Sequence, residues 1–78
     1  MVTPEKVQSY IEKGLACEQV SVVGDGQHFE ALIVSDAFRG KSRVQRHQLV
    51  YAALGERMRE EIHALSMRTL TPEEATNG

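Results

Sequence analysis

The sequence predicts an α+β two-layer sandwich in which helices lie on one face of a three-stranded mixed sheet. Apolar residues recur at helical spacing within residues 3–14 and 43–58, and strand-forming segments occupy residues 18–23, 29–35 and 62–70. The resulting order is helix, strand, strand, helix, strand. It favours a sheet with helices on one face and water or a partner on the other.

The N-terminal segment carries the signals of a helix start. Thr3 supplies a hydroxyl cap, Pro4 suits the first helical position, and Glu5 places a carboxylate near the positive end of the helix dipole. The apolar stripe that follows reaches Gly14, a residue type that commonly ends helices. We therefore expect the first helix at about residues 3–14.

Turn-forming residues separate the first two predicted strands. Val20 and Val22 alternate with their neighbours, and the loop GDGQ leads to a second strand from Phe29 to Ser35. This spacing predicts an antiparallel hairpin. No helix follows the GDG glycines, so they are better explained as a turn than as a phosphate-binding loop. Residues 36–40 are expected to be a short connector.

The second helix is predicted over residues 43–58. Ser42 and Gln45 match a capping box, and one face of the segment is apolar over several turns. Gly55 weakens the last turns by roughly 1 kcal/mol relative to alanine. The residues expected on the apolar face are Val44, His47, Val50, Tyr51, Leu54 and Met58.

Residues 62–70 return to period two and predict a third strand. The strand–helix–strand crossover should be right-handed, which makes the second and third strands parallel if they are neighbours. The sequence from Thr71 to Glu74 repeats the capped start of the first helix, but little chain follows. We therefore expect residues 75–78 to form a ragged C-terminal tail.

Length and composition indicate a single domain over residues 1–78 with a small core. Hydrophobic residues make up 41% of the chain and the net charge is −2, which is typical of a globular protein. No apolar run approaches the about 18 to 20 residues of a membrane span, and the N-terminus lacks the layout of a signal peptide. The single Cys17 cannot close an intramolecular disulfide. A cytoplasmic protein with no membrane association is expected.

The histidines are the candidate metal ligands. His47 lies on the predicted apolar face, where a hydrogen-bonded core histidine is expected. His28 follows the hairpin loop and His63 precedes the third strand, and side chains at such positions can be exposed and can converge. Two imidazoles make an incomplete metal site, so a partner would have to supply the other ligands. Cys17 is expected to be a small buried thiol rather than a reactive one.

No enzyme motif is present: the chain has no phosphate loop, paired-cysteine metal knuckle, HExxH sequence or nucleophile elbow. We therefore expect a non-enzymatic protein. A cluster of basic residues at the start of the second helix suggests an anion-binding surface, although a solvated helix face explains it somewhat better, because few aromatic residues are present for base stacking. The candidate nucleic-acid-binding residues are Arg39, Lys41, Arg43, Arg46 and His47.

Two stretches of the sequence resemble the BolA family of small proteins. They are FRGKSRVQRHQLV at residues 38–50 and IHALSMRTLTPEE at residues 62–74. The pieces F-x-G-K, R-H-x-x-V, I-H-A-L and T-L-T-P follow the family's order and spacing. The resemblance covers residues 4–74, and the GDGQHF loop is most similar to the bacterial IbaG-type branch. It implies a class II K-homology-like fold of the αββααβ type, with residues 36–39 as the additional short helix.

The resemblance also implies a partner. BolA-like proteins pair with monothiol glutaredoxins, and the pair can hold a two-iron two-sulfur cluster together with glutathione. By position, His63 matches the family's shared histidine ligand and His28 matches its variable loop ligand. No cofactor is then expected in the isolated chain, which would be a monomer or a weak homodimer. The leading prediction is a non-enzymatic adaptor in iron–sulfur cluster assembly, cluster trafficking or iron regulation.

The family's second association is transcriptional regulation in response to stress. K-homology domains that grip nucleic acid use a G-x-x-G loop, whereas this chain has only Gly40 within RGKS. Binding to DNA through the basic residues is therefore the second hypothesis. A third is a stress-induced scaffold that binds neither ligand. Ala75 replaces an aromatic residue that many relatives carry, so the resemblance implies a short or absent C-terminal helix.

Overall fold

A three-stranded mixed sheet forms the centre of the molecule. The computed structural model describes residues 2–77 and contains β1 (Gln19–Gly24), β2 (His28–Val34) and β3 (Ala64–Leu70), in that spatial order. β1 pairs with β2 antiparallel, and β2 pairs with β3 parallel. The predicted hairpin, the parallel pair and the mixed sheet are confirmed.

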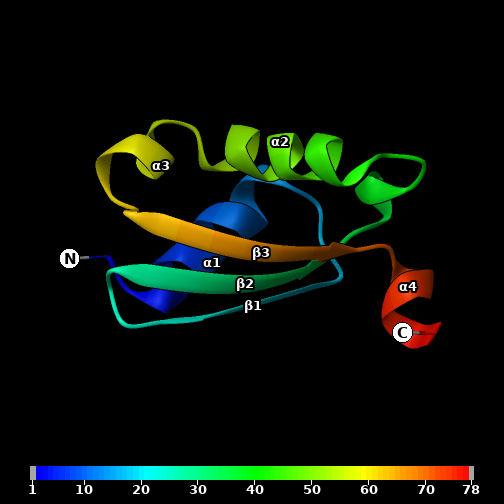
Figure 1. The fold of residues 1–78 in the computed structure, drawn as a ribbon, viewed down its shortest axis with the longest axis horizontal. Coiled ribbons are helices and arrows are strands. Elements are labelled where there is room, and N and C mark those ends of the chain that lie inside the picture. The colour runs from blue at the N-terminus through cyan, green and yellow to red at the C-terminus, as the bar shows by residue number, and fades with distance from the viewer. Residues whose placement is uncertain (1, 78) are drawn as a thin grey trace.

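Two helices, α1 (Pro4–Gly14) and α2 (Arg43–Leu54), pack against one face of this sheet. Figure 1 shows α1 behind the sheet and α2 running along β3. Gly14 allows the close approach of the helices, because an added Cβ would lie 2.8 Å from the Cα of Ala53. The core between the layers includes Val7, Ile11, Val20, Phe29, Ala31, Ile33, Val50 and Leu54. The two-layer α+β architecture is therefore confirmed.

The predicted helix starts are also present. The Oγ1 atom of Thr3 accepts a hydrogen bond of 3.2 Å from the N–H of Lys6. Both bonds of the Ser42–Gln45 capping box form, with distances of 2.9 and 3.2 Å. These bonds satisfy N–H groups that have no partner within their own helices.

The single helix expected over residues 43–58 is divided into two. α2 ends at Leu54, and a separate short helix, α3 (Glu56–Glu60), follows. Gly55 between them has a φ of +59°, a left-handed conformation that glycine adopts readily. The prediction was wrong because this glycine turns the chain rather than merely weakening the helix.

The predicted apolar face of α2 was only partly correct. Val50 and Leu54 are buried, but Val44 is 65% exposed and Tyr51 is 41% exposed. The residues of α2 that face inward recur at every fourth position and are Arg46, Val50 and Leu54. His47 is half-buried with no hydrogen bond described for its ring, so the prediction of a hydrogen-bonded core histidine was wrong.

Two short helices complete the fold. Residues expected to be a connector include the 3-10 helix η1 (Asp36–Phe38), as the family resemblance implied, and Phe38 is fully buried. The tail expected from residue 75 is instead helical, because α4 (Pro72–Asn77) extends to Asn77. Gly78, the last residue of the expected tail, lies outside the described residues. Within residues 2–77, no helix is long and apolar enough to cross a membrane.

Candidate functional site

The two ends of the sheet carry different chemistry. At the first, which we call the histidine end, β2 and β3 begin beside His28 and His63. At the second, the basic end, both strands finish close to the start of α2 and to α4. Figure 1 shows α3 and α4 at these opposite ends. The length of β2 separates them by about 20 Å.

The strand register brings the two candidate metal ligands to the same end. His28 is paired with Ala64, the residue that follows His63. The Nε2 atom of His28 lies 3.1 Å from the Oγ atom of Ser66. His63 is exposed on the bend before β3 and lines a separate hollow of about 480 Å³, together with Val2, Lys6, Glu60 and Glu61. The structure therefore places both imidazoles at one end but gives them different surroundings.

The histidine end does not form a complete metal site by itself. No group of three or more histidine, cysteine, aspartate or glutamate side chains within residues 2–77 is arranged to hold a metal ion. Cys17 lies just before β1, whose first residue pairs with the last residue of β2. It is therefore at the opposite end from His28 and cannot complete the ligand set.

Two sets of contacts fix the segments that carry the histidines. The Oδ1 atom of Asp25 accepts bonds of 2.9 and 3.0 Å from the N–H groups of Gln27 and His28, and these bonds lower the pKa of Asp25. Near His63, the Tyr10 hydroxyl donates a 3.0 Å bond to Oε1 of Glu61, and the Arg57 guanidinium lies 4.3 Å from the centre of the Tyr10 ring.

These supporting residues were not among the predicted site residues. The GDG turn could have indicated Asp25, because aspartate commonly accepts bonds from the backbone two or three residues on. No local signal could have indicated Tyr10, which is 51 residues away from Glu61.

The Cys17 thiol is half-buried, and its Sγ atom donates to the carbonyl oxygen of Leu15 over 3.2 Å. Burial, with a smaller contribution from the nearby charge of Glu12, raises the pKa of Cys17. Because the thiolate is the nucleophile, a raised pKa makes this thiol less reactive. The prediction of an unreactive thiol is supported, although the side chain is less buried than expected.

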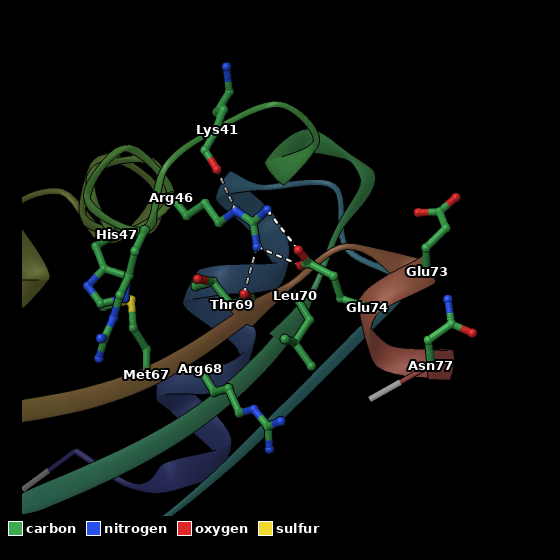
Figure 2. A pocket seen from close by; sticks show the side chains of 11 residues that line it. Lys41, Arg46, His47, Met67, Arg68, Thr69, Leu70, Glu73, Glu74 and Asn77 are labelled. Carbon is green, nitrogen blue, oxygen red and sulfur yellow. Dashed lines mark hydrogen bonds and ion pairs between the residues drawn. The ribbon is translucent and has the colours of Figure 1, made fainter.

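At the basic end, a hollow of about 700 Å³ lies between α2, β3 and α4, as Figure 2 shows. Arg46 is its central residue, with a side chain only 14% exposed. Its Nε donates to the Lys41 carbonyl and its Nη1 to the Thr69 carbonyl, each over 3.0 Å. Nη1 also donates to Oε1 of Glu74 over 2.7 Å. Hydrogen bonding to Arg46 lowers the pKa of Glu74 to about 2.

The second arginine of the basic stretch is also paired. Arg39 donates to a carboxylate oxygen of Asp36 and, over 2.8 Å, to Oε2 of Glu73. The bond from Arg39 lowers the pKa of Glu73. Two of the five predicted nucleic-acid-binding residues, Arg39 and Arg46, therefore form ion pairs with carboxylates of α4.

The remaining predicted residues surround the hollow. Lys41 and Arg43 are exposed and line it, and no carboxylate of residues 2–77 lies within ion-pair distance of either. His47 lines it beside Met67. Arg68, which sequence analysis did not select, also lines the hollow. Only the packing of α2 beside β3 brings Arg68 near the basic stretch.

Comparisons with known proteins agree with the resemblance found in the sequence. The family described as BolA-like protein matches residues 7–74. The acid stress protein IbaG of Escherichia coli K12 is 40% identical over 70 residues, which cover 88% of this chain and 83% of that protein. The DNA-binding transcriptional regulator BolA of Haemophilus influenzae is 45% identical over 51 residues, covering 65% and 50%.

A solved structure shows the same fold. The BolA protein homologue from Coxiella burnetii superposes with a TM-score of 0.91 and is 47% identical, covering 97% of this chain and 99% of that one. The similarity therefore extends over the histidine end, the basic end and the helices between them.

Proposed function

Since the chain belongs to the BolA family, we propose that it is a non-enzymatic adaptor that shares a two-iron two-sulfur cluster with a monothiol glutaredoxin and glutathione. The match to IbaG over most of the chain confirms the predicted IbaG-type branch. The observation that carries the proposal is the placement of His28 and His63 at one end of the sheet, both exposed. The cytoplasm is the proposed location, because thiols such as Cys17 stay reduced there.

The side chains present fit a shared cluster better than a resident metal ion. Imidazole nitrogen is a suitable ligand for iron, but this end of the chain offers two imidazoles and no thiolate. Thiolates from the glutaredoxin and glutathione would complete the ligand set. When bound, the cluster supplies a transferable iron–sulfur unit with redox activity.

His63 is the stronger ligand candidate of the two. It is exposed on a bend, and no hydrogen bond is described for its ring, so the ring can reorient towards a partner. His28 is held within hydrogen-bond distance of Ser66 and lies in a strand. The Tyr10–Glu61 bond and the Arg57 stacking fix the turn before His63, so the partner meets the ligand at a defined position.

A neutral imidazole ligand has two consequences for the shared site. It brings less negative charge than a thiolate, which raises the reduction potential of iron–sulfur centres. It must also be deprotonated to bind, so the bond weakens in acid. These properties suit transfer or sensing of a cluster rather than its permanent storage.

The test is anaerobic reconstitution of the chain with a monothiol glutaredoxin, glutathione, iron and sulfide, followed by size-exclusion chromatography with visible absorption. We expect a coloured heterodimer from the wild type and a lost or altered spectrum with His63→Ala. His28→Ala should alter the spectrum less. His47→Ala, which removes the histidine at the opposite end, is the matched control and should behave as wild type. A spectrum that is the same with and without His63 would contradict the proposal.

A second candidate function is nucleic-acid binding in transcriptional regulation. Two observations favour it: Lys41 and Arg43, beside the start of α2, form no ion pair within residues 2–77, and one relative is named a DNA-binding transcriptional regulator. Lys41→Gln with Arg43→Gln should weaken binding to a labelled oligonucleotide and lessen its salt dependence. Unchanged binding would show that these two side chains do not contact nucleic acid and are part of a solvated helix face.

A further inference from the structure

The two arginines of the basic end are held by neighbouring carboxylates of one short helix. Glu73 bonds to Arg39 over 2.8 Å, and Glu74 bonds to Arg46 through both carboxylate oxygens, at 2.7 and 3.3 Å. Figure 2 shows Glu74 directed at the Arg46 guanidinium, beside the hollow. A guanidinium binds the oxygens of a carboxylate and of a phosphate with the same two-pronged geometry. The carboxylate oxygens therefore occupy positions that phosphate oxygens would take.

We propose that α4 is an intramolecular competitor that occupies the phosphate-binding arginines of the basic end, and that single-stranded nucleic acid binds there by displacing it. The inference rests on the second candidate function. It adds a regulation of that site, because the affinity for nucleic acid would depend on how firmly α4 is held.

The structure of α4 suits a displaceable element. The helix has only six residues, none of them buried. The Arg39–Glu73 pair is more than half exposed on both sides. Surface pairs of this kind are weak and are screened by salt. A polyanion can therefore replace Glu73 at Arg39.

The arginine left behind would remain in place. The bonds from Arg46 to the carbonyl groups of Lys41 and Thr69 do not involve α4. They hold the guanidinium at the wall of the hollow after Glu74 leaves. Three further cations, Lys41, Arg43 and Arg68, line the same hollow. With Glu74 displaced, Arg46 would face the hollow beside Lys41 and Arg43.

Protonation is a poor way to release α4. The pKa of Glu74 is lowered to about 2, so this carboxylate stays charged at all ordinary pH values. A competing anion is therefore the more effective means of displacement. Without displacement, Glu73 and Glu74 would repel the phosphate backbone of a nucleic acid that approaches the hollow.

The test compares binding of a short, fluorescein-labelled, single-stranded oligodeoxynucleotide by fluorescence anisotropy. Glu73→Gln with Glu74→Gln should bind about 10-fold more tightly than wild type at low salt. The gain should appear as affinity, because in both proteins Arg39 and Arg46 contact phosphates once the oligonucleotide is bound, and only wild type must first release their bonds to Glu73 and Glu74. The glutamine oxygen at position 74 can still accept the bond from Thr71, which preserves the start of α4.

The matched control makes the same change of net charge elsewhere. Glu5→Gln with Glu12→Gln alters two exposed carboxylates of α1 and should raise the affinity much less. An equal effect of the two double variants would overturn the inference, because net charge alone would then explain the gain. Hydrogen exchange on the unmodified chain is the second measurement: the amides of α4 should exchange faster when the oligonucleotide is added, and unchanged or slower exchange would also overturn it.

Failure of the inference can be distinguished from failure of the underlying function. If Lys41→Gln with Arg43→Gln weakens binding but the α4 variant does not change the affinity, the nucleic-acid site stands and the competitor role is rejected. If wild type and all variants fail to bind at low salt, both are rejected.

Discussion

The histidine end and the basic end differ in how many of their functional side chains already bond to other residues of the chain. At the basic end, Arg39 and Arg46 are paired with Glu73 and Glu74, and Arg46 also bonds two backbone carbonyls. At the histidine end, His63 is exposed on a bend, and the nearby contacts hold its surroundings rather than its ring. The number of charges in a sequence segment is therefore a poor guide to which side chains remain available to a partner.

The largest expected effect is destabilisation of the whole fold, including both ends of the sheet, by a substitution in the core. Phe38 is fully buried, and Arg46 lies 5.9 Å from the centre of its ring. Phe38→Ala should lower the free energy of unfolding by about 3–5 kcal/mol, which is much of the stability of a domain this small. Urea unfolding followed by circular dichroism would measure it, with Phe38→Leu as a milder control. An unfolding midpoint close to that of wild type would show that the ends do not share one core.

The next largest effect is a difference in stability cost between an arginine substitution at the basic end and one near the histidine end. Arg46→Ala should cost about 2 kcal/mol, because it removes several charged hydrogen bonds from a mostly buried side chain. Arg57→Ala removes an exposed stacking contact on Tyr10 and should cost less than about 1 kcal/mol. The same urea titrations test this difference. A larger loss for Arg57→Ala would reverse the comparison.

Acid should weaken the basic end through Glu74. The pKa of this carboxyl is lowered from 4.5 to about 2 in the folded chain, chiefly by its bond to Arg46. A lowered pKa means that the charged form stabilises the fold above about pH 4.5 and that this contribution is lost as the pH falls towards 2. The stability advantage of wild type over Glu74→Gln should therefore shrink over this range. A constant difference in urea midpoint from neutral pH to pH 3 would contradict the pairing.

The smallest effect is expected at Cys17, which lies at the opposite end of the sheet from His28. Cys17→Ser should leave the visible spectrum of the reconstituted heterodimer unchanged, because the side chain lies about 20 Å from the proposed ligands. The raised pKa of the thiol predicts slow alkylation by iodoacetamide at neutral pH. A spectrum altered by this substitution would indicate a cluster position other than the histidine end.

The features predicted correctly from sequence are those that local signals determine. The caps at Thr3 and Ser42 and the hairpin turn depend on residues within four positions of one another. The errors arose where distant segments decide the outcome. The position of α2 beside β3 leaves Val44 and Tyr51 exposed and His47 outside the core.

The same limit applies to the candidate sites. The bonds that fasten α4 join residues 34 and 28 positions apart, so no local pattern could show that the basic residues are paired. For the histidines, the residue types and the family resemblance indicated the ligands, but only the parallel register of β2 and β3 places them at one end.

The most direct test of the central claim is pulsed electron paramagnetic resonance on the reduced heterodimer, with ¹⁵N-labelled histidine in this chain alone. If an imidazole of this chain binds the cluster, a ¹⁵N coupling of the size expected for a directly bound nitrogen should be present in wild type and His47→Ala. It should be weakened or lost in His63→Ala and changed less in His28→Ala. Absence of that coupling from the wild-type complex would contradict the account.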